Sequence, residues 1–141
     1  MIENNPTLER LEDQLKYYSK SSKNNKHWFT RLKAVEIIAA ALIPLLAIAS
    51  LPPFFSAILG LIIVILEGLQ GLNQYQSNWI TYRSTAEELK HEKYLWLAKA
   101  GPYMNAANPD TLLAERIESL ISRENAKWVS TQEQGPKKEP V

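Results

Sequence analysis

The chain lacks cysteine altogether and has two histidines among its 141 residues. The absence of cysteine excludes disulfide bonds, thiol nucleophiles and zinc ribbons, and two isolated histidines supply no metal-ligand spacing. Neither sign of charge dominates, since 16 lysines and arginines stand against 15 aspartates and glutamates. Such a balance argues against a protein that binds nucleic acid through bulk basicity, so we expect no nucleic-acid partner.

Motifs of the common enzyme classes are also missing from the sequence. It contains no nucleophile elbow, no glycine-rich phosphate loop and no H-E-x-x-H zinc motif, and no paired carboxylates in a pocket context. The first residues carry no basic region of the kind that opens a cleaved signal peptide. We therefore predict a protein that is not an enzyme, with no catalytic residues, no metal and no cofactor.

What the chain does have is one concentrated apolar block. Residues 37–66 are 30 consecutive residues without a charged side chain, and 24 of them are apolar. Pro52 and Pro53 divide the block, because two adjacent prolines cannot lie inside a helix. With their flanks, the halves form segments 32–51 and 54–72, close to the length that crosses a bilayer. A soluble hairpin buried in a larger core is the alternative, but the rest of the chain is too polar to cover it.

Helical periodicity extends on both sides of these segments. We predict cytoplasmic helices at about 6–31, 73–100 and 109–129. Together with the two spans they form a single domain over residues 1–129, followed by a disordered tail at 130–141. A turn centred at Pro52 pairs the two long helices antiparallel, with opposed residue numbers adding to about 104. This pairing brings together two heptad seams, which are apolar except at Ser22, Asn25 and Lys93. They are Leu8, Leu11, Leu15, Tyr18, Ser22, Asn25, Phe29 and Leu32 on one side, and Tyr75, Trp79, Tyr82, Ala86, Leu89, Lys93 and Trp96 on the other. The predicted fold class is an all-α membrane protein, with a long antiparallel two-helix transmembrane hairpin that extends into a cytoplasmic helical stalk, and a short C-terminal amphipathic helix.

Orientation follows from the basic residues. The turn at Pro52 carries no lysine or arginine, whereas the entry to the first span is crowded with Lys20, Lys23, Lys26, Arg31 and Lys33. By the positive-inside rule, both termini are cytoplasmic. We expect a multi-pass protein of the inner membrane.

Two carboxylates in the spans are the first candidates for a function. The predicted pairing places Glu36 opposite Gly68, beside Glu67, so both acids lie at one depth near the cytoplasmic boundary. Gln70, Gln74 and Asn78 continue a polar stripe on roughly the same face as Glu67. One interpretation is an acidic ring at the mouth of a pore, lined further by these amides. The alternatives are that Glu36 pairs with Lys33, that Glu67 reaches the interface, and that the amides are hydrogen-bonding groups at a subunit contact.

Other residues indicate assembly rather than conduction. Trp28 and Trp79 lie where aromatic interface anchors are expected, and Tyr82 follows one turn later. Gly68 and Gly71 permit close approach of helices. Arg83 and Glu87 lie at helical spacing just beyond the membrane, where ion pairs along the stalk or between subunits can form.

Three stretches of the sequence resemble a known family. They are 78–92, with the pattern W-x-x-Y-R-x-T-x-E-x-L-K-x-E, then 100–103 and 122–129. They are similar to the SLATT-type (SMODS- and SLOG-associating) two-transmembrane effector domains, in the stand-alone branch of formerly unknown function. The resemblance covers about residues 8–129. It implies a bacterial inner-membrane protein with two spans and a cytoplasmic helical region, from a family proposed to form pores or perturb membranes.

These observations predict an oligomeric membrane channel or pore, cation-preferring and gated through its cytoplasmic helices. Small residues in the spans and apolar seams on an open hairpin favour a homo-oligomer in the lipid bilayer. The expected partners are thus further copies of the chain, lipid, permeating cations and a cytoplasmic regulatory partner. The alternative is a non-conducting membrane scaffold or anchor that recruits a cytoplasmic partner in a bacterial defence or signalling system.

Overall fold

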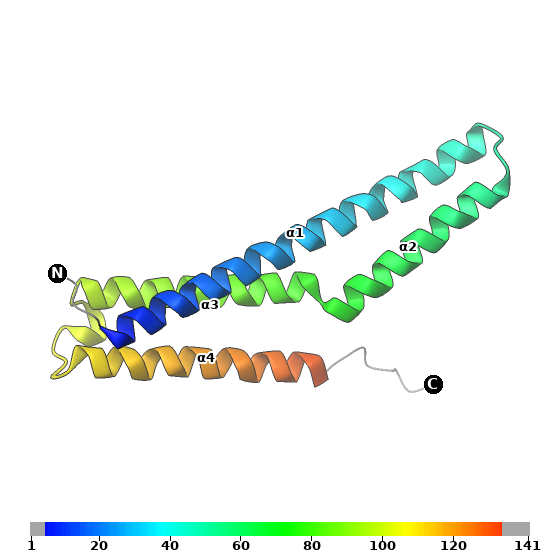
Figure 1. Ribbon diagram of the computed structural model, residues 1–141. Helices are drawn as coiled ribbons and strands as arrows, with labels where there is room; N and C mark the ends of the chain where they lie inside the picture. The colour runs from blue at the N-terminus through cyan, green and yellow to red at the C-terminus, as the bar shows by residue number, and fades with distance from the viewer. Residues whose placement is uncertain (1–4, 134–141) are drawn as a thin grey trace. The chain divides into compact units, whose positions relative to one another are not determined.

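The structure is a computed structural model that describes residues 5–133, and 89% of these residues are helical with none in a strand. The α-helices are α1 (Pro6–Ile48), α2 (Pro53–Asn73), α3 (Tyr75–Leu97) and α4 (Pro109–Glu133), with a 3-10 turn η1 (Gly101–Tyr103) between the last two (Figure 1). The prediction of an all-helical protein is thereby confirmed.

The described residues divide into two compact units. Residues up to Lys20 and from Thr81 onward form one, which we call the bundle unit, and Ser21–Ile80 forms the other, which we call the hairpin unit. Both α1 and α3 contribute residues to each unit.

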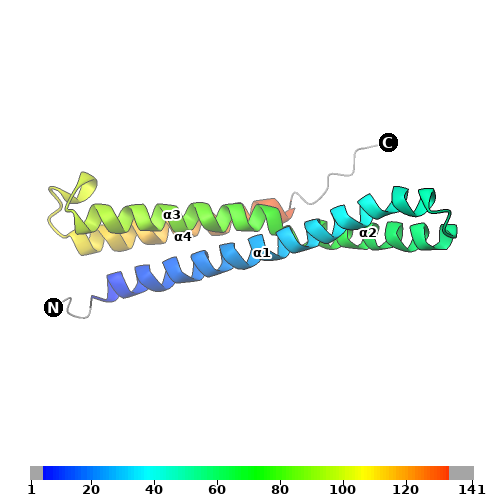
Figure 2. The same ribbon diagram turned by 90° about the horizontal axis from the view of Figure 1, so that it is seen from above.

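In the hairpin unit, the C-terminal half of α1 and the whole of α2 lie side by side and antiparallel (Figures 1 and 2). The end of α1 is closed by hydrogen bonds from the Ser50 N–H to the Ala47 carbonyl and from the Leu51 N–H to the Leu46 carbonyl. Ser50 has the left-handed φ of 57° that this type of helix end requires. Pro53 then opens α2 at its first position, where a missing N–H costs nothing.

The pairing register agrees with the predicted antiparallel alignment. Side-chain contacts across the hairpin unit join residues whose numbers add to values between 100, for Lys33 and Glu67, and 106, for Glu36 and Gln70. Within the bundle unit, Lys93 bonds to Glu12, two residues whose numbers add to 105. Every residue of the two predicted seams is buried or half-buried. Heptad spacing was therefore a sufficient guide to which faces meet.

The second long helix is not continuous, contrary to the sequence prediction. Gln74 adopts a left-handed conformation, with φ 48° and ψ 40°, and separates α2 from α3. Side-chain amides compensate for the interrupted ladder, because Asn73 Nδ2 donates to the Leu69 carbonyl at 2.9 Å and Asn78 Nδ2 donates to the Asn73 carbonyl at 3.1 Å. The polar stripe was expected on one straight helix, but Gln70 precedes the break and Asn78 follows it.

The bundle unit packs the first turns of α1 against α3 and α4 around a core of its own. That core comprises Leu8, Leu11, Tyr18, Ala86, Leu89, Tyr103, Leu113, Ile117 and Leu120. Asn5 Oδ1 accepts a hydrogen bond from the Thr7 N–H at 3.1 Å, and Asn108 Oδ1 accepts one from the Thr111 N–H at 3.3 Å. An asparagine side chain thus caps the first turn of both α1 and α4.

Helix ends differ slightly from the predicted boundaries. α3 ends at Leu97, three residues early, because Lys99 turns left-handed with φ 52° and the Ala100 N–H bonds to the Leu95 carbonyl. α4 continues to Glu133, four residues into the stretch expected to be disordered. The rest of that predicted tail, 134–141, lies outside the described residues.

By length and composition, one helical stretch of the described chain is suited to crossing a membrane. It runs over Pro53–Tyr103, and 6% of its most apolar window is buried within the protein. The apolar part of α1 is not a second candidate, since the last 18 residues of this helix, up to Ile48, include the charged side chains of Arg31, Lys33 and Glu36. The fold therefore supports one candidate span directly.

Candidate functional site

The hairpin unit gathers the predicted acidic residues around a single lysine. Lys33 Nζ lies 3.3 Å from Glu36 Oε2 and 3.1 Å from Glu67 Oε2, so one ammonium group bridges both helices. Gln70 Nε2 donates a hydrogen bond to Glu36 Oε2 at 2.9 Å. We call Lys33, Glu36, Glu67 and Gln70 the charged cluster.

The two carboxylates of the charged cluster have different surroundings. The side chain of Glu36 is 15% exposed, whereas that of Glu67 is 62% exposed. Glu36 is held by both Lys33 and Gln70, and Glu67 is held by Lys33. With one basic and two acidic side chains, the charged cluster has a formal net charge of −1.

The structure brings Gln70 to Glu36, but it does not extend the cluster to Gln74 and Asn78. Gln74 occupies the break between α2 and α3, and Asn78 caps the carbonyl of Asn73. Three buried polar atoms in this region have no hydrogen-bond partner in the described part of the chain: Gln70 Oε1, Gln74 Oε1 and Trp79 Nε1. Buried polar atoms are usually paired, so this part of the hairpin unit retains unmet hydrogen-bonding capacity.

Of the aromatic residues predicted to serve assembly, Trp79 and Tyr82 make defined contacts. Trp79 accepts a hydrogen bond from the Ser22 hydroxyl at its backbone carbonyl, at 3.0 Å, and Lys26 Nζ lies 5.5 Å from its ring centroid. Trp28 is largely exposed. Tyr82 belongs to the bundle unit, where the centroid of its ring lies 5.9 Å from that of Tyr18.

The glycines and the remaining charged residues face outward. A Cβ atom added to Gly68 or Gly71 would meet no atom within 4 Å in the described structure. A close approach of helices at these positions is thus not made within one chain. Arg83 and Glu87 are exposed, and Glu87 pairs with Lys90 at 3.3 Å along α3, as helical spacing predicts.

A buried ion pair in the bundle unit was not predicted from the sequence. Glu92 accepts hydrogen bonds from Arg116 Nε at 2.8 Å and Nη2 at 2.6 Å, and from the Tyr103 hydroxyl at 2.6 Å. The bonds from Arg116, and secondarily from Tyr103, hold the pKa of the Glu92 carboxyl below its ordinary value against the opposing effect of burial. Burial and the same carboxylate raise the pKa of the Tyr103 hydroxyl.

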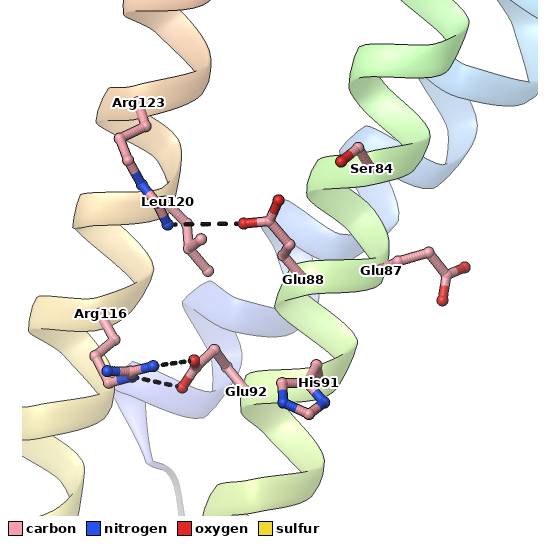
Figure 3. A pocket seen from close by; sticks show the side chains of 8 residues that line it. All are labelled: Ser84, Glu87, Glu88, His91, Glu92, Arg116, Leu120 and Arg123. Atoms are coloured by element: carbon pink, nitrogen blue, oxygen red, sulfur yellow. Dashed lines mark hydrogen bonds and ion pairs between the residues drawn. The ribbon is translucent and has the colours of Figure 1, made fainter. Parts of the chain in front are cut away.

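This ion pair lies at a pocket of about 480 Å³ between α3 and α4 (Figure 3). Its lining residues are Ser84, Glu87, Glu88, His91, Glu92, Arg116, Leu120 and Arg123. Arg116 binds Glu92 through two nitrogens, whereas Arg123 Nη2 lies 3.7 Å from Glu88 Oε2. Both ion pairs link α4 to α3 (Figure 3). Two of the three acids that line the pocket, Glu88 and Glu92, are therefore paired with arginines of α4, and these pairs join the two helices.

A sequence signal for Glu92 did exist. Thr85, Leu89 and Glu92 follow one another at steps of four and three, so a helix places them on one face, and all three are buried on α3. Arg116 carried no such signal, because its partner is set by how α4 docks. In the residues that the structure describes, no group of three or more histidine, cysteine, aspartate or glutamate side chains is placed to hold a metal ion.

Comparison with known proteins gives one match. Residues 13–111 match the family described as "Protein of unknown function (DUF4231)", which is more than half of the chain. No curated protein and no solved structure matches the chain.

Proposed function

This chain belongs to the DUF4231 family, and from that premise we propose that it is a two-span membrane protein whose copies assemble into a cation-preferring channel or pore. The matched residues 13–111 include the central motif that resembles the SLATT-type effector domains. Assignment to that group, and the pore-forming role that it implies, are part of the proposal.

The observation that carries the membrane part is the exposed apolar surface of the hairpin unit. Ile37, Leu45, Ile48, Leu61 and Val64 are each at least 59% exposed. Between residues 37 and 66, Ala39 is the one buried residue in the described chain. A continuous apolar surface on both helices is far more than a water-soluble protein tolerates, and lipid is the solvent that suits it.

Both helices cross the bilayer in this proposal, although the one candidate span by length and composition contains α2 and not α1. The apolar half of α1 lies against α2 in the same unit, and the turn that joins them has no charged residue. An apolar hairpin that entered with one helix only would leave the exposed apolar side chains of the other in water. The basic residues from Lys20 to Lys33 place both termini on the cytoplasmic side.

Assembly of several copies is favoured by what the hairpin unit leaves unmatched. Gly68 and Gly71 are open to a neighbouring helix, because a Cβ atom added to either would meet no atom within 4 Å in the described structure. Small residues permit the close approach by which transmembrane helices join. A ring of copies would also repeat the net charge of −1 of the charged cluster once per subunit, which attracts cations.

Conductance of the purified full-length chain in planar bilayers tests this proposal. Glu67→Gln removes the exposed charge and brings the three ionisable groups to neutrality, whereas Lys33→Gln raises their net charge to −2. We expect cation-over-anion selectivity to fall in Glu67→Gln and to rise in Lys33→Gln, with Glu115→Gln on α4 as the charge-matched control. The proposal fails if wild-type protein passes no ions, or if the two cluster variants shift selectivity in the same direction.

A non-conducting scaffold is the second candidate, and the bundle unit is the observation that favours it. This unit has its own core and leaves Tyr94, Leu97 and Met104 more than half exposed. Such residues suit the docking of a cytoplasmic partner. Replacing both spans with an unrelated transmembrane hairpin separates the two functions, because a scaffold keeps its activity in cells and a channel loses it.

A further inference from the structure

A second pocket of the bundle unit combines aromatic rings with a buried carboxylate. It has a volume of about 240 Å³ and is lined by Tyr17, Tyr18, Tyr82, Glu124, Asn125 and Trp128. α1 supplies the first two tyrosines, α3 the third, and α4 the other three residues. The pocket therefore depends on all three helices of the unit.

Glu124 gives the pocket a negative charge in a position where water is scarce. The residue is 5% exposed, and the Tyr18 hydroxyl donates a hydrogen bond to its Oε2 at 3.2 Å. Burial, and next the Glu124 carboxylate, raise the pKa of Tyr18, so this phenol remains a neutral donor. A neutral donor leaves the charge of the carboxylate in place, and a buried charge is costly unless an opposite charge approaches it.

Aromatic rings form the walls next to this carboxylate. The ring of Tyr18 lies 5.2 Å from that of Tyr17, edge to face at 77°, and 5.9 Å from that of Tyr82, tilted by 43°. Trp128 completes the lining from α4. Ring faces carry negative electrostatic potential and attract cations, and tryptophan attracts them most strongly.

We propose that this pocket binds a small organic cation with an ammonium group, held by Glu124 and by the surrounding rings. The pocket volume of about 240 Å³ equals the volume that about eight water molecules occupy in liquid water. This volume is enough for a compact amine but is below the usual size of drug-binding pockets. The carboxylate repels anions, and a neutral apolar ligand would leave it unpaired. The inference concerns the bundle unit alone and does not depend on whether the protein conducts ions.

Calorimetric titration of the detergent-solubilised full chain tests the site, with choline chloride as the probe. We expect saturable binding of choline in the millimolar range. The matched ligand is the uncharged carbon isostere of choline, in which carbon replaces the ammonium nitrogen, and we expect it not to bind. Equal binding of the two ligands, or no choline binding at all, overturns the proposal.

Variants locate the binding at this pocket. Glu124→Gln keeps the shape of the side chain and removes its charge, and we expect about tenfold weaker binding of choline. Glu115→Gln, an exposed change of equal charge on the same helix, is the control that should bind as wild type does. Trp128 is 45% exposed, so Trp128→Leu retains the fold and is expected to weaken binding independently. Unchanged affinity in Trp128→Leu and in a folded Glu124→Gln overturns the assignment.

Discussion

Replacing Arg116 by methionine tests how the buried ion pair holds the bundle unit together. Methionine keeps most of the apolar stem but removes both hydrogen bonds to Glu92, whose side chain is 7% exposed. The carboxylate then stays buried with the Tyr103 hydroxyl as a remaining donor. Breaking a fully buried pair costs up to about 5 kcal/mol. Because the Arg116 side chain is 42% exposed, water reaches the site, and we expect a loss of roughly 2–3 kcal/mol.

Hydrogen–deuterium exchange of the full-length chain in detergent measures this loss locally. A change of roughly 2–3 kcal/mol corresponds to about 30-fold to 160-fold faster exchange of protected amides in α3 and α4. The matched control is Arg123→Met, which removes an exposed pair of 3.7 Å and should cost about 1 kcal/mol at most. Adding Glu92→Leu to Arg116→Met should recover part of the loss, since no unpaired charge is then buried. If Arg116→Met exchanges no faster than Arg123→Met, the reasoning is refuted.

Three further predictions concern pH, a helix end and assembly. Since the pKa of Glu92 is lowered in the folded protein, its contribution to folding stability is present above the unfolded pKa of about 4.3 and is lost as pH falls through the folded value. Amide exchange in α3 should therefore accelerate in acid, and less so in Glu92→Gln. An identical acid response in both proteins would contradict this. Lys99→Gly relieves the strain of a left-handed φ of 52° and should stabilise the last turn of α3 by about 1 kcal/mol, which slows amide exchange there. Lys99→Val should accelerate this exchange. Equal exchange in the two variants would argue against a strained helix end. Gly68→Ile meets open space within one chain, so helix content should persist while chemical cross-linking of copies in membranes decreases; undiminished cross-linking would place the subunit contact elsewhere.

Periodicity in the sequence was enough to predict which faces of α1 and α3 pack. Leu8, Leu11 and Tyr18 belong to the heptad seam of α1 and Leu89 to that of α3, and all four are buried. The prediction succeeds because the position of a residue in a heptad follows from the neighbouring sequence, and that position decides whether its side chain is buried. The positions of Glu36 and Glu67 at one level followed from the same register, and Lys33 pairs with both.

Features that depend on contacts between particular side chains could not be predicted from periodicity. Glutamine favours helices, so nothing at Gln74 signals a break, and the amides that support it come from Asn73 and Asn78. The partner of Glu92 depends on how α4 docks, which no single-helix pattern encodes. The pocket at Glu124 likewise needs side chains from α1, α3 and α4 at once.

The proposed function rests on the claim that the hairpin unit lies in the bilayer. The chain has no cysteine, so single cysteines can be introduced without removing any native thiol. Leu45→Cys and Leu61→Cys probe exposed apolar positions of α1 and α2 in the hairpin unit, and Glu115→Cys probes the exposed surface of α4. With a membrane-impermeant maleimide on open membrane vesicles, the account predicts rapid labelling at 115 and none at 45 or 61 until detergent is added. Labelling at 45 and 61 as rapid as at 115 before detergent would contradict it.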